Sequence, residues 1–226
     1  EWTVAPSDAP APAEVVIAFE GGVPVALDGE RLDPVVLVER LHDLGGAHGV
    51  GRIDHVEDRL VGIKSREIYE APAASILHTA HHALEGLTLS RDTLRFNRFV
   101  ADELARLIYD GLWFSALSRD LRAYAASSQR VVSGDVRMRL DHGQAVVVGR
   151  QSPLSMYDRS LATYDEGDAF DHASAVGFIE IFGLPLRVEA ARHGAVGKHH
   201  GAAWTWTDPL LADLPTIVTD PETASV

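Results

Sequence analysis

The sequence of 226 residues contains no cysteine. Disulfide frameworks, thiolate zinc sites and cysteine nucleophiles are therefore excluded. The sequence also lacks an apolar run near the roughly 18 residues that span a bilayer, and it has no charged start followed by an apolar export segment. We therefore expect a soluble protein of the cytoplasm.

Basic residues are scarce, because 20 Lys and Arg stand against 33 Asp and Glu and give a formal charge of -13. Such a surface repels nucleic acid and anionic lipid, so we expect no nucleic acid and no membrane among the partners. The hydrophobic content of 46% is that of a globular chain, which at this length forms one domain or at most two. Since the first residue is Glu1 and not methionine, we expect the chain to be part of something longer.

Turn signals divide the chain into short β-rich runs and longer helical ones. A Gly21-Gly22 pair lies between two β-rich runs, and Asp141-His142-Gly143 lies between two others, so each predicts a β-hairpin. Residues 72–129 show apolar side chains at helical spacing and predict at least two long helices. The fold class predicted is α+β, with β-hairpins around a long helical middle packed into one domain.

Boundaries follow from the same signals. The Pro/Ala run over residues 1–13 predicts a linker or a crossing segment. Residues 14–193 are predicted to form the domain, and residues 194–226 are predicted to form an irregular C-terminal appendage. Asp33 and Pro34 predict the start of a helix that buries one apolar face and ends at Gly45 and Gly46.

The stretch "HGVGRIDHVEDRLVGIKSREIYE", His48 to Glu70, holds three glycines and nine charged side chains. It could be a phosphate cradle, a charged hairpin, or one wall of a pocket for a small zwitterion. The glycines follow a predicted helix and precede a predicted strand, without the Gly-Lys-Ser/Thr ending of a phosphate loop, so a plain turn is favoured. The centre of the stretch alternates loosely, as a half-buried strand would.

Within this stretch, Glu57 and Tyr69 are the candidate binding residues. A carboxylate binds an ammonium through charge-assisted hydrogen bonds, and a phenol donates a hydrogen bond while its ring walls the site. A surface salt-bridged hairpin remains the alternative, because charge clusters are usually solvated. The three histidines of "HTAHH", at positions 78, 81 and 82, favour solvated or capping roles over a metal site.

Several phrases match one known family in collinear order, from about residue 14 to about residue 193. They include "GVPVALDGE", "LGGAHGVGRIDHVEDRLVGIKSREIYEAP", "LHTAHHALEGLTLSRD", "LARLIYDGLWFS", "SSQRVVSGDVRM", "VVVGRQSPLSMYD" and "LATYDEGDAFDHASAVGFI". The chain resembles argininosuccinate synthase, in the C-terminal synthetase and oligomerisation region. A dozen blocks in order are far more specific than any single motif.

The resemblance implies a ligase of arginine biosynthesis and the urea cycle, which joins citrulline to aspartate and converts ATP to AMP and pyrophosphate. In the family the ureido oxygen attacks the α-phosphate, and the aspartate amine then displaces AMP. The resemblance also implies a homotetramer assembled through a C-terminal helix, and ATP, with Mg²⁺, bound by an N-terminal nucleotide domain.

The residues that match family citrulline contacts are Glu57 and Tyr69; Lys64, Ser65 and Arg66 carry no role that the resemblance assigns. Near them the sequence departs from the family at three places. Ala47 stands where the family commonly has lysine, and Glu67 where it commonly has glycine. Pro72 is followed by Ala73, Ala74 and Ser75 where the family commonly has Pro-x-Gly-Thr. We expect altered substrate handling to be possible at these positions.

The family's Ser-Gly-Gly-x-Asp-Thr-Ser loop, which holds the ATP phosphates, does not occur in this sequence. No catalytic, cofactor-binding or metal-binding residue is therefore assigned to this chain. We expect a synthetase part of an argininosuccinate synthase that binds citrulline, receives ATP and aspartate through a nucleotide domain outside the chain, and is inactive alone. The alternative is a stand-alone relative without ATPase activity, acting as a binding module or as one subunit of a split ligase.

Overall fold

The computed structural model describes residues 2–162 and 172–199. The chain divides into two compact units, Glu1–Tyr164 and Asp165–Val226. The expected domain of residues 14–193 therefore spans both units. The expected start of the irregular appendage, at residue 194, falls inside a helix that runs to His199, and residues 200–226 lie outside the described residues.

An antiparallel sheet of five strands, in the order β3-β2-β1-β6-β7, is the framework of the first unit. Its strands are β1 (Ala13–Glu20), β2 (Val23–Leu27), β3 (Glu30–Arg31), β6 (Gly134–Asp141) and β7 (Gln144–Gln151). Both predicted hairpins are confirmed: the turn residues 21 and 22 have φ of 55° and 81°, and residues 142 and 143 have φ of 45° and 85°. Positive φ at both central residues matches the right-handed twist of the flanking strands.

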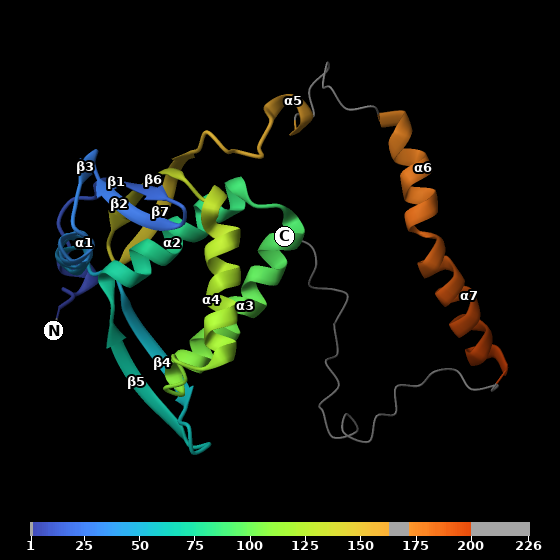
Figure 1. Ribbon diagram of the computed structural model, residues 1–226, viewed down its shortest axis with the longest axis horizontal. Helices are drawn as coiled ribbons and strands as arrows, with labels where there is room; N and C mark the ends of the chain where they lie inside the picture. The colour runs from blue at the N-terminus through green and yellow to red at the C-terminus, as the bar shows by residue number, and fades with distance from the viewer. Residues whose placement is uncertain (1, 163–171, 200–226) are drawn as a thin grey trace, which may run out of the picture. The chain divides into compact units, whose positions relative to one another are not determined.

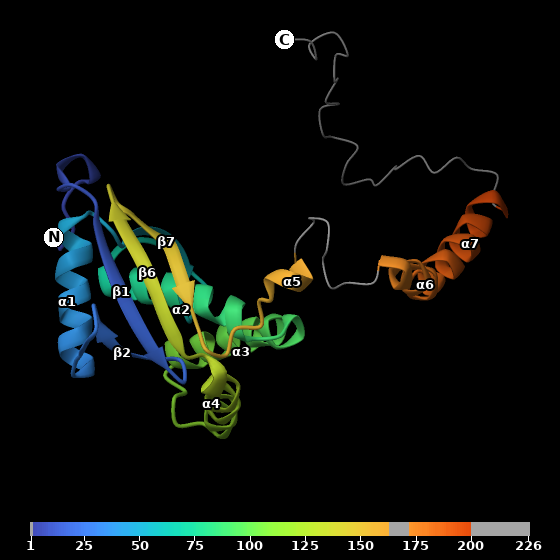
Figure 2. The ribbon, with the colours of Figure 1, turned by 90° about the horizontal axis from the view of Figure 1, so that it is seen from above.

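One face of this sheet carries the core. Helices α1 (Pro34–Ala47) and α2 (Pro72–Thr88) pack against each other and against the sheet (Figure 1 and Figure 2). The strands contribute every second residue and α2 contributes every fourth, as the strand and helix periods require. The fully or nearly fully buried side chains at the centre are Val15, Ile17, Phe19, Leu37, Leu41, Ile76, Ala80, Leu84, Val136, Met138 and Leu140.

Helix α1 begins as predicted but ends later than predicted. The Asp33 side chain accepts the N–H of Val35 at 2.9 Å, which caps the first turn. The predicted end at Gly45 and Gly46 is wrong, because α1 continues through both to residue 47. A Cβ added at residue 45 would lie 2.9 Å from Cβ of Pro72, so this glycine allows α1 and α2 to approach closely.

The predicted helical middle is confirmed. After α2 come α3 (Arg91–Tyr109) and α4 (Ala116–Ser128), which lie side by side (Figure 1). Each begins after a serine whose hydroxyl accepts a backbone N–H: Ser90 from Thr93, and Ser115 from Ser118. The remaining short helices of the first unit are η1 (Pro6–Asp8), η2 (Gln129–Val131) and α5 (Arg159–Ala162).

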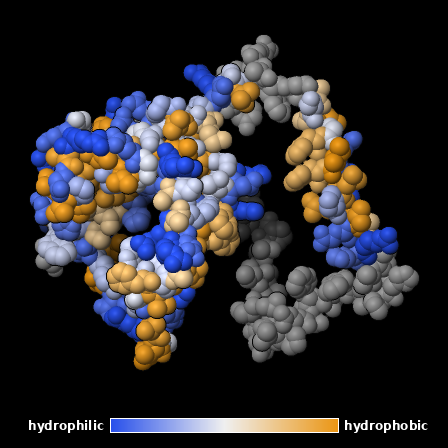
Figure 3. All heavy atoms as spheres, viewed as in Figure 1, coloured by the Kyte–Doolittle hydropathy of each residue, from blue (hydrophilic) through white to orange (hydrophobic). Residues whose placement is uncertain are grey.

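Strands β4 (Arg52–Asp58) and β5 (Lys64–Glu70) pair only with each other and project from the first unit as an arm (Figure 1). The prediction of a half-buried strand is wrong, because every residue of β4 is exposed except Glu57. The alternation in sequence reflects the two sides of the arm, neither of which packs as a core layer. Apolar side chains gather at its free end (Figure 3), namely Leu60, Val61 and Ile63.

The N-terminal segment crosses the root of this arm. The N–H of Val4 donates to the carbonyl of Gly46 at 3.0 Å, and the side chain of Thr3 is buried. Glu70, the last residue of β5, accepts hydrogen bonds from the N–H of Trp2, the hydroxyl of Thr3 and the guanidinium of Arg52. One carboxylate thus joins the N-terminal segment to both strands of the arm.

In the second unit, α6 (His172–Phe182) and α7 (Leu184–His199) are separated at Gly183. Large apolar side chains of α6 are exposed (Figure 3), namely Val176, Phe178, Ile179, Ile181 and Phe182. No helix in the described ranges is long and apolar enough to cross a membrane.

Two glycines inside helices allow a test of the α1–α2 contact. Gly45→Ala should destabilise the chain by about 1–3 kcal/mol, because the new methyl group would overlap Pro72 and the fully buried Ile76. Gly86→Ala, in α2, should stabilise it by about 0.5–1 kcal/mol, because nothing lies within 4 Å of the added Cβ. Urea denaturation followed by circular dichroism measures both. Equal midpoints for the two variants would contradict this account of the contact.

Candidate functional site

The pairing register of the arm divides its side chains between two faces. Tyr69 lies opposite Ile53, and Ser65 lies opposite Glu57. Because successive side chains of a strand alternate, residues 57, 65, 67 and 69 share one face. The hydroxyl of Tyr69 donates to Oε2 of Glu57 at 3.1 Å. The structure thus brings together the two residues that the sequence predicts as a pair.

Arg59, in the turn after β4, folds back onto this face. Its Nη1 lies 3.0 Å from Oε1 of Glu57, its Nη2 donates to Oε1 of Glu67 at 2.6 Å, and its Nε donates to Oγ of Ser65 at 2.8 Å. A single guanidinium therefore faces two carboxylates and a hydroxyl. We name the five residues Glu57, Arg59, Ser65, Glu67 and Tyr69 the arm cluster.

The carboxylate of Glu57 is the buried member of the cluster. Its side chain is 10% exposed, whereas that of Arg59 is 45% exposed. Oε1 of Glu57 is buried and accepts no hydrogen bond, although the charge of Arg59 lies within ion-pair distance. Since an ionised carboxylate oxygen can accept more than one hydrogen bond, the acceptor capacity of Oε1 is unused within the described residues, and it would become accessible to an N–H donor only if Arg59 moved. An ammonium group is the donor that fits an acceptor of this charge.

Desolvation and neighbouring charges raise the pKa values of two donors in the cluster. The pKa of Tyr69 is raised above its usual value, first by desolvation of the phenol and second by the hydrogen bond to Glu57. The pKa of Arg59 is raised above its usual value chiefly by the negative charge of Glu57. At neutral pH the phenol therefore remains a hydrogen-bond donor and the guanidinium remains a cation.

Three members of the cluster carried no assigned role at the sequence level. Arg59 lies in a turn, where strand alternation does not predict the direction of a side chain. Ser65 and Glu67 have the same parity as Tyr69 in β5, and that parity was the signal that could have found them. Lys64 and Arg66 have the opposite parity; they pair with aspartates on the other face of the arm.

The three departures from the family pattern occupy different places. Glu67 belongs to the arm cluster and forms an ion pair with the guanidinium of Arg59. Ala47 ends α1 and is exposed, while residues 73–75 form the first turn of α2 at the root of the arm, with Ala73 buried. Of these departures, only Glu67 lies on the face that carries Glu57.

The glycine-rich stretch before the arm is a helix-ending turn. The consecutive N–H groups of His48, Gly49 and Val50 donate to the carbonyls of Gly45 and Gly46 at 2.9–3.1 Å. Amides that are already paired within the protein cannot cradle a phosphate. The interpretation as a turn is confirmed for this stretch.

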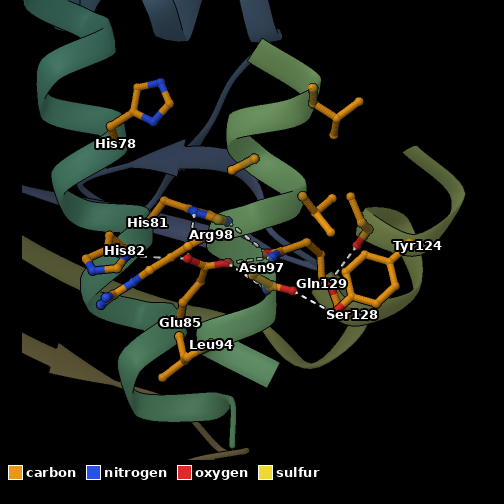
Figure 4. A pocket seen from close by; sticks show the side chains of 14 residues that line it. His78, His81, His82, Glu85, Leu94, Asn97, Arg98, Tyr124, Ser128 and Gln129 are labelled. Atoms are coloured by element: carbon orange, nitrogen blue, oxygen red, sulfur yellow. Dashed lines mark hydrogen bonds and ion pairs between the residues drawn. The ribbon is translucent and has the colours of Figure 1, made fainter. Parts of the chain in front are cut away.

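The histidines of α2 line a cavity between α2, α3 and α4 (Figure 4). Nε2 of His81 lies 2.9 Å from Oε1 of Gln129, and because that oxygen only accepts, Nε2 carries the proton. His78 and His82 are exposed. Across residues 2–162 and 172–199, no group of three or more histidine, aspartate or glutamate side chains is placed to hold a metal ion.

The contact between Glu57 and Tyr69 makes a testable prediction. Glu57→Gln should lower the pKa of Tyr69, because a neutral amide removes the negative charge that disfavours the phenolate. Asp54→Asn, on the opposite face of the arm, is the matched control and should leave that pKa unchanged. NMR titration of tyrosine labelled with ¹³C at Cζ measures both values. An unchanged value in the Glu57 variant would show that the two side chains do not interact in solution.

Comparisons with known proteins identify the family. Residues 1–189 match the model of the arginosuccinate synthase C-terminal domain. Curated relatives named argininosuccinate synthase include those of Dehalococcoides mccartyi strain ATCC BAA-2266, 58% identical over 180 residues, and Symbiobacterium thermophilum, 57% identical over 192 residues. These alignments cover 80% and 84% of this chain but 44% and 48% of the relatives. The chain thus spans about half the length of the relatives it matches, over the region of their C-terminal domain, and it belongs to the argininosuccinate synthase family.

Proposed function

We propose that this chain supplies the citrulline-binding and oligomerisation part of an argininosuccinate synthase, a ligase that joins citrulline and aspartate at the expense of ATP. The observation that carries the proposal is the carboxylate of Glu57, which is buried to 10% exposure and has one oxygen without a hydrogen bond. In this assignment Oε1 accepts the ammonium of citrulline, and the ring of Tyr69 walls the amino-acid end of the site.

The role assigned to this chain is binding and orientation. Tyr69 holds Oε2 of Glu57 through its hydroxyl, and Nη1 of Arg59 lies 3.0 Å from the buried Oε1, so an ammonium would reach Oε1 by displacing that guanidinium. A site built in this way fixes one end of a substrate and leaves the other end free to react elsewhere. The proposed ATP site lies outside this chain, since the Ser-Gly-Gly-x-Asp-Thr-Ser loop that the resemblance assigns to the ATP phosphates does not occur in this sequence. We therefore propose that the chain is inactive alone.

Glu67 favours a second candidate, a stand-alone relative that acts as a binding module or as one subunit of a split ligase. Where the resemblance leads one to expect glycine, this carboxylate binds Nη2 of Arg59 at 2.6 Å. It adds a negative charge beside Glu57 and so changes the charge that a ligand would meet. A pulldown from the source cell separates the versions, because a split ligase requires a separate nucleotide-binding partner.

Citrulline binding tests the role of Glu57. In isothermal titration calorimetry of the chain with citrulline, Glu57→Gln should weaken binding by about 1.5–3 kcal/mol, the range of a hydrogen bond to a charged group. Asp54→Asn removes a carboxylate from the other face of the arm and should leave the affinity unchanged.

Two outcomes would contradict parts of this proposal. Equal affinity of Glu57→Gln and the unaltered chain would remove Glu57 from the site. Absence of binding by the unaltered chain, with restored binding in Glu67→Gly, would favour the stand-alone relative, because it would show that the extra carboxylate alters the pocket.

The exposed apolar side chains of α6 support the proposed role in self-association, for which the family tetramer is the expected form. The rings of Phe178 and Phe182 stack at 5.2 Å between centroids, and both side chains are more than 60% exposed. Burying such side chains against another copy would contribute about 25 cal/mol for each Å² of apolar surface removed from water.

Light scattering coupled to size-exclusion chromatography tests this role. Phe182→Asp should lower the mass of the assembly, because a buried unpaired carboxylate at an interface is costly. Glu189→Gln, an exposed change on α7, should leave the mass unchanged. A monomeric unaltered chain, or an unchanged mass in the Phe182 variant, would contradict the role of α6.

A further inference from the structure

A second site lies in the first unit, apart from the arm. The cavity between α2, α3 and α4 has a volume of about 380 Å³, within the range of small-molecule pockets (Figure 4). No residue of β4 or β5 lines it. Its lining combines polar side chains with apolar ones, and the apolar group is Leu94, Val100, Ala101, Leu104 and Ala125.

One side of the cavity is a closed hydrogen-bond network around Glu85. Its Oε1 accepts from Nε2 of Gln129 at 2.7 Å and from Nδ2 of Asn97 at 3.4 Å. Gln129 in turn accepts from His81, and Asn97 accepts from the hydroxyl of Tyr124 at 2.9 Å. The Glu85 side chain is only 13% exposed. Its charge is thus held by several donors, and the network is satisfied without a ligand.

The other side presents donors that the network does not use. Arg98 of α3 is exposed and makes no hydrogen bond or ion pair within the described residues, and the same holds for His78 of α2. The Arg98 side chain reaches back from α3 toward His82 on α2 (Figure 4). His82 makes no hydrogen bond; its Nδ1 lies 3.6 Å from Oε2 of Glu85. A permanent cation and two imidazoles outside the network, those of His78 and His82, therefore line the cavity of a chain whose formal charge is -13.

We propose that this cavity binds a small organic carboxylate with an apolar body. The guanidinium of Arg98 offers a planar fork of N–H donors that matches a carboxylate, and each neutral imidazole offers one further N–H. The apolar side chains of α3 and α4 cover the body of the ligand. A cation is disfavoured, because Arg98 would repel it and the one carboxylate of the cavity is already paired.

The requirement for a negative charge on the ligand is tested with two isosteric probes, 1-naphthoate and its neutral analogue 1-naphthamide. Each probe is titrated into the whole chain and followed by ¹⁵N NMR. Naphthoate should shift the amides of residues 78–85 and 94–104 and bind at least tenfold more tightly than naphthamide. Inorganic phosphate alone should bind more weakly than naphthoate, since it has no apolar body. Equal binding of the two naphthalene probes, or tighter binding of phosphate, would overturn the assignment of a carboxylate ligand.

Binding of the probe inside the cavity is tested with variants of residues on α3. Arg98→Gln should weaken naphthoate binding at least tenfold, the loss expected for one charged hydrogen bond. Arg95→Gln is the matched control: it is an exposed arginine on the same helix that does not line the cavity, and it should change the affinity less than twofold. Ala101→Trp should abolish binding by filling the cavity.

Both arginine positions are exposed, so neither change should affect folding, which circular dichroism checks. Equal effects of the Arg98 and Arg95 variants would overturn the proposal, because they would show attraction by general charge alone. Shifts confined to α6 and α7 would also overturn it, because they would place the probe on the exposed apolar side chains of the second unit.

Discussion

The carboxylate of Glu70 holds the root of the arm, and the candidate citrulline site depends on that root. It accepts hydrogen bonds from the hydroxyl of Thr3, the N–H of Trp2 and the guanidinium of Arg52, in that order of effect, and these bonds lower its pKa from 4.5 to about 2. Because the folded pKa lies below the unfolded one, its contribution to stability is present above pH 4.5 and is lost as the pH falls toward 2. A two-stranded arm without a core layer has few apolar contacts of its own, so the clamp at Glu70 stabilises its root, together with the hydrogen bond from the N–H of Ala71 to the carbonyl of Gly51.

The two faces of the arm use similar residues in different ways. On one face Arg66 binds Asp54 through two hydrogen bonds, and both side chains are more than half exposed, so the pair contributes little to stability. On the other face, the charges converge on Glu57, whose side chain is withdrawn from solvent. Strand alternation separates the strand residues of these two sets, and Glu57 is the one member of the second set whose side chain is largely withdrawn from solvent.

Local signals predicted the elements well, whereas burial depended on what packs against them. The glycine pair at 21–22 and the cap at Asp33 are local features, and both hairpin and helix start were confirmed. Whether β4 is half-buried depends on a covering layer, which no local pattern encodes. The glycines at 45 and 46 carry an end signal, yet their contact with α2 and with the N-terminal segment keeps them inside the helix. The contact of Glu57 with Tyr69 followed from their pattern, but the position of Arg59 required the turn geometry.

A carboxylate buried on a projecting arm is a costly arrangement, and the contacts of Glu57 offset that cost only in part. Removing an ion from water is unfavourable unless its charge and its acceptor capacity are both satisfied. Arg59 supplies the opposite charge at 3.0 Å, but it gives Oε1 of Glu57 no hydrogen bond. A purely structural ion pair, such as that of Arg66 and Asp54, makes aligned hydrogen bonds instead. The incomplete bonding of Glu57 is the physical argument behind the ammonium contact that we propose for it.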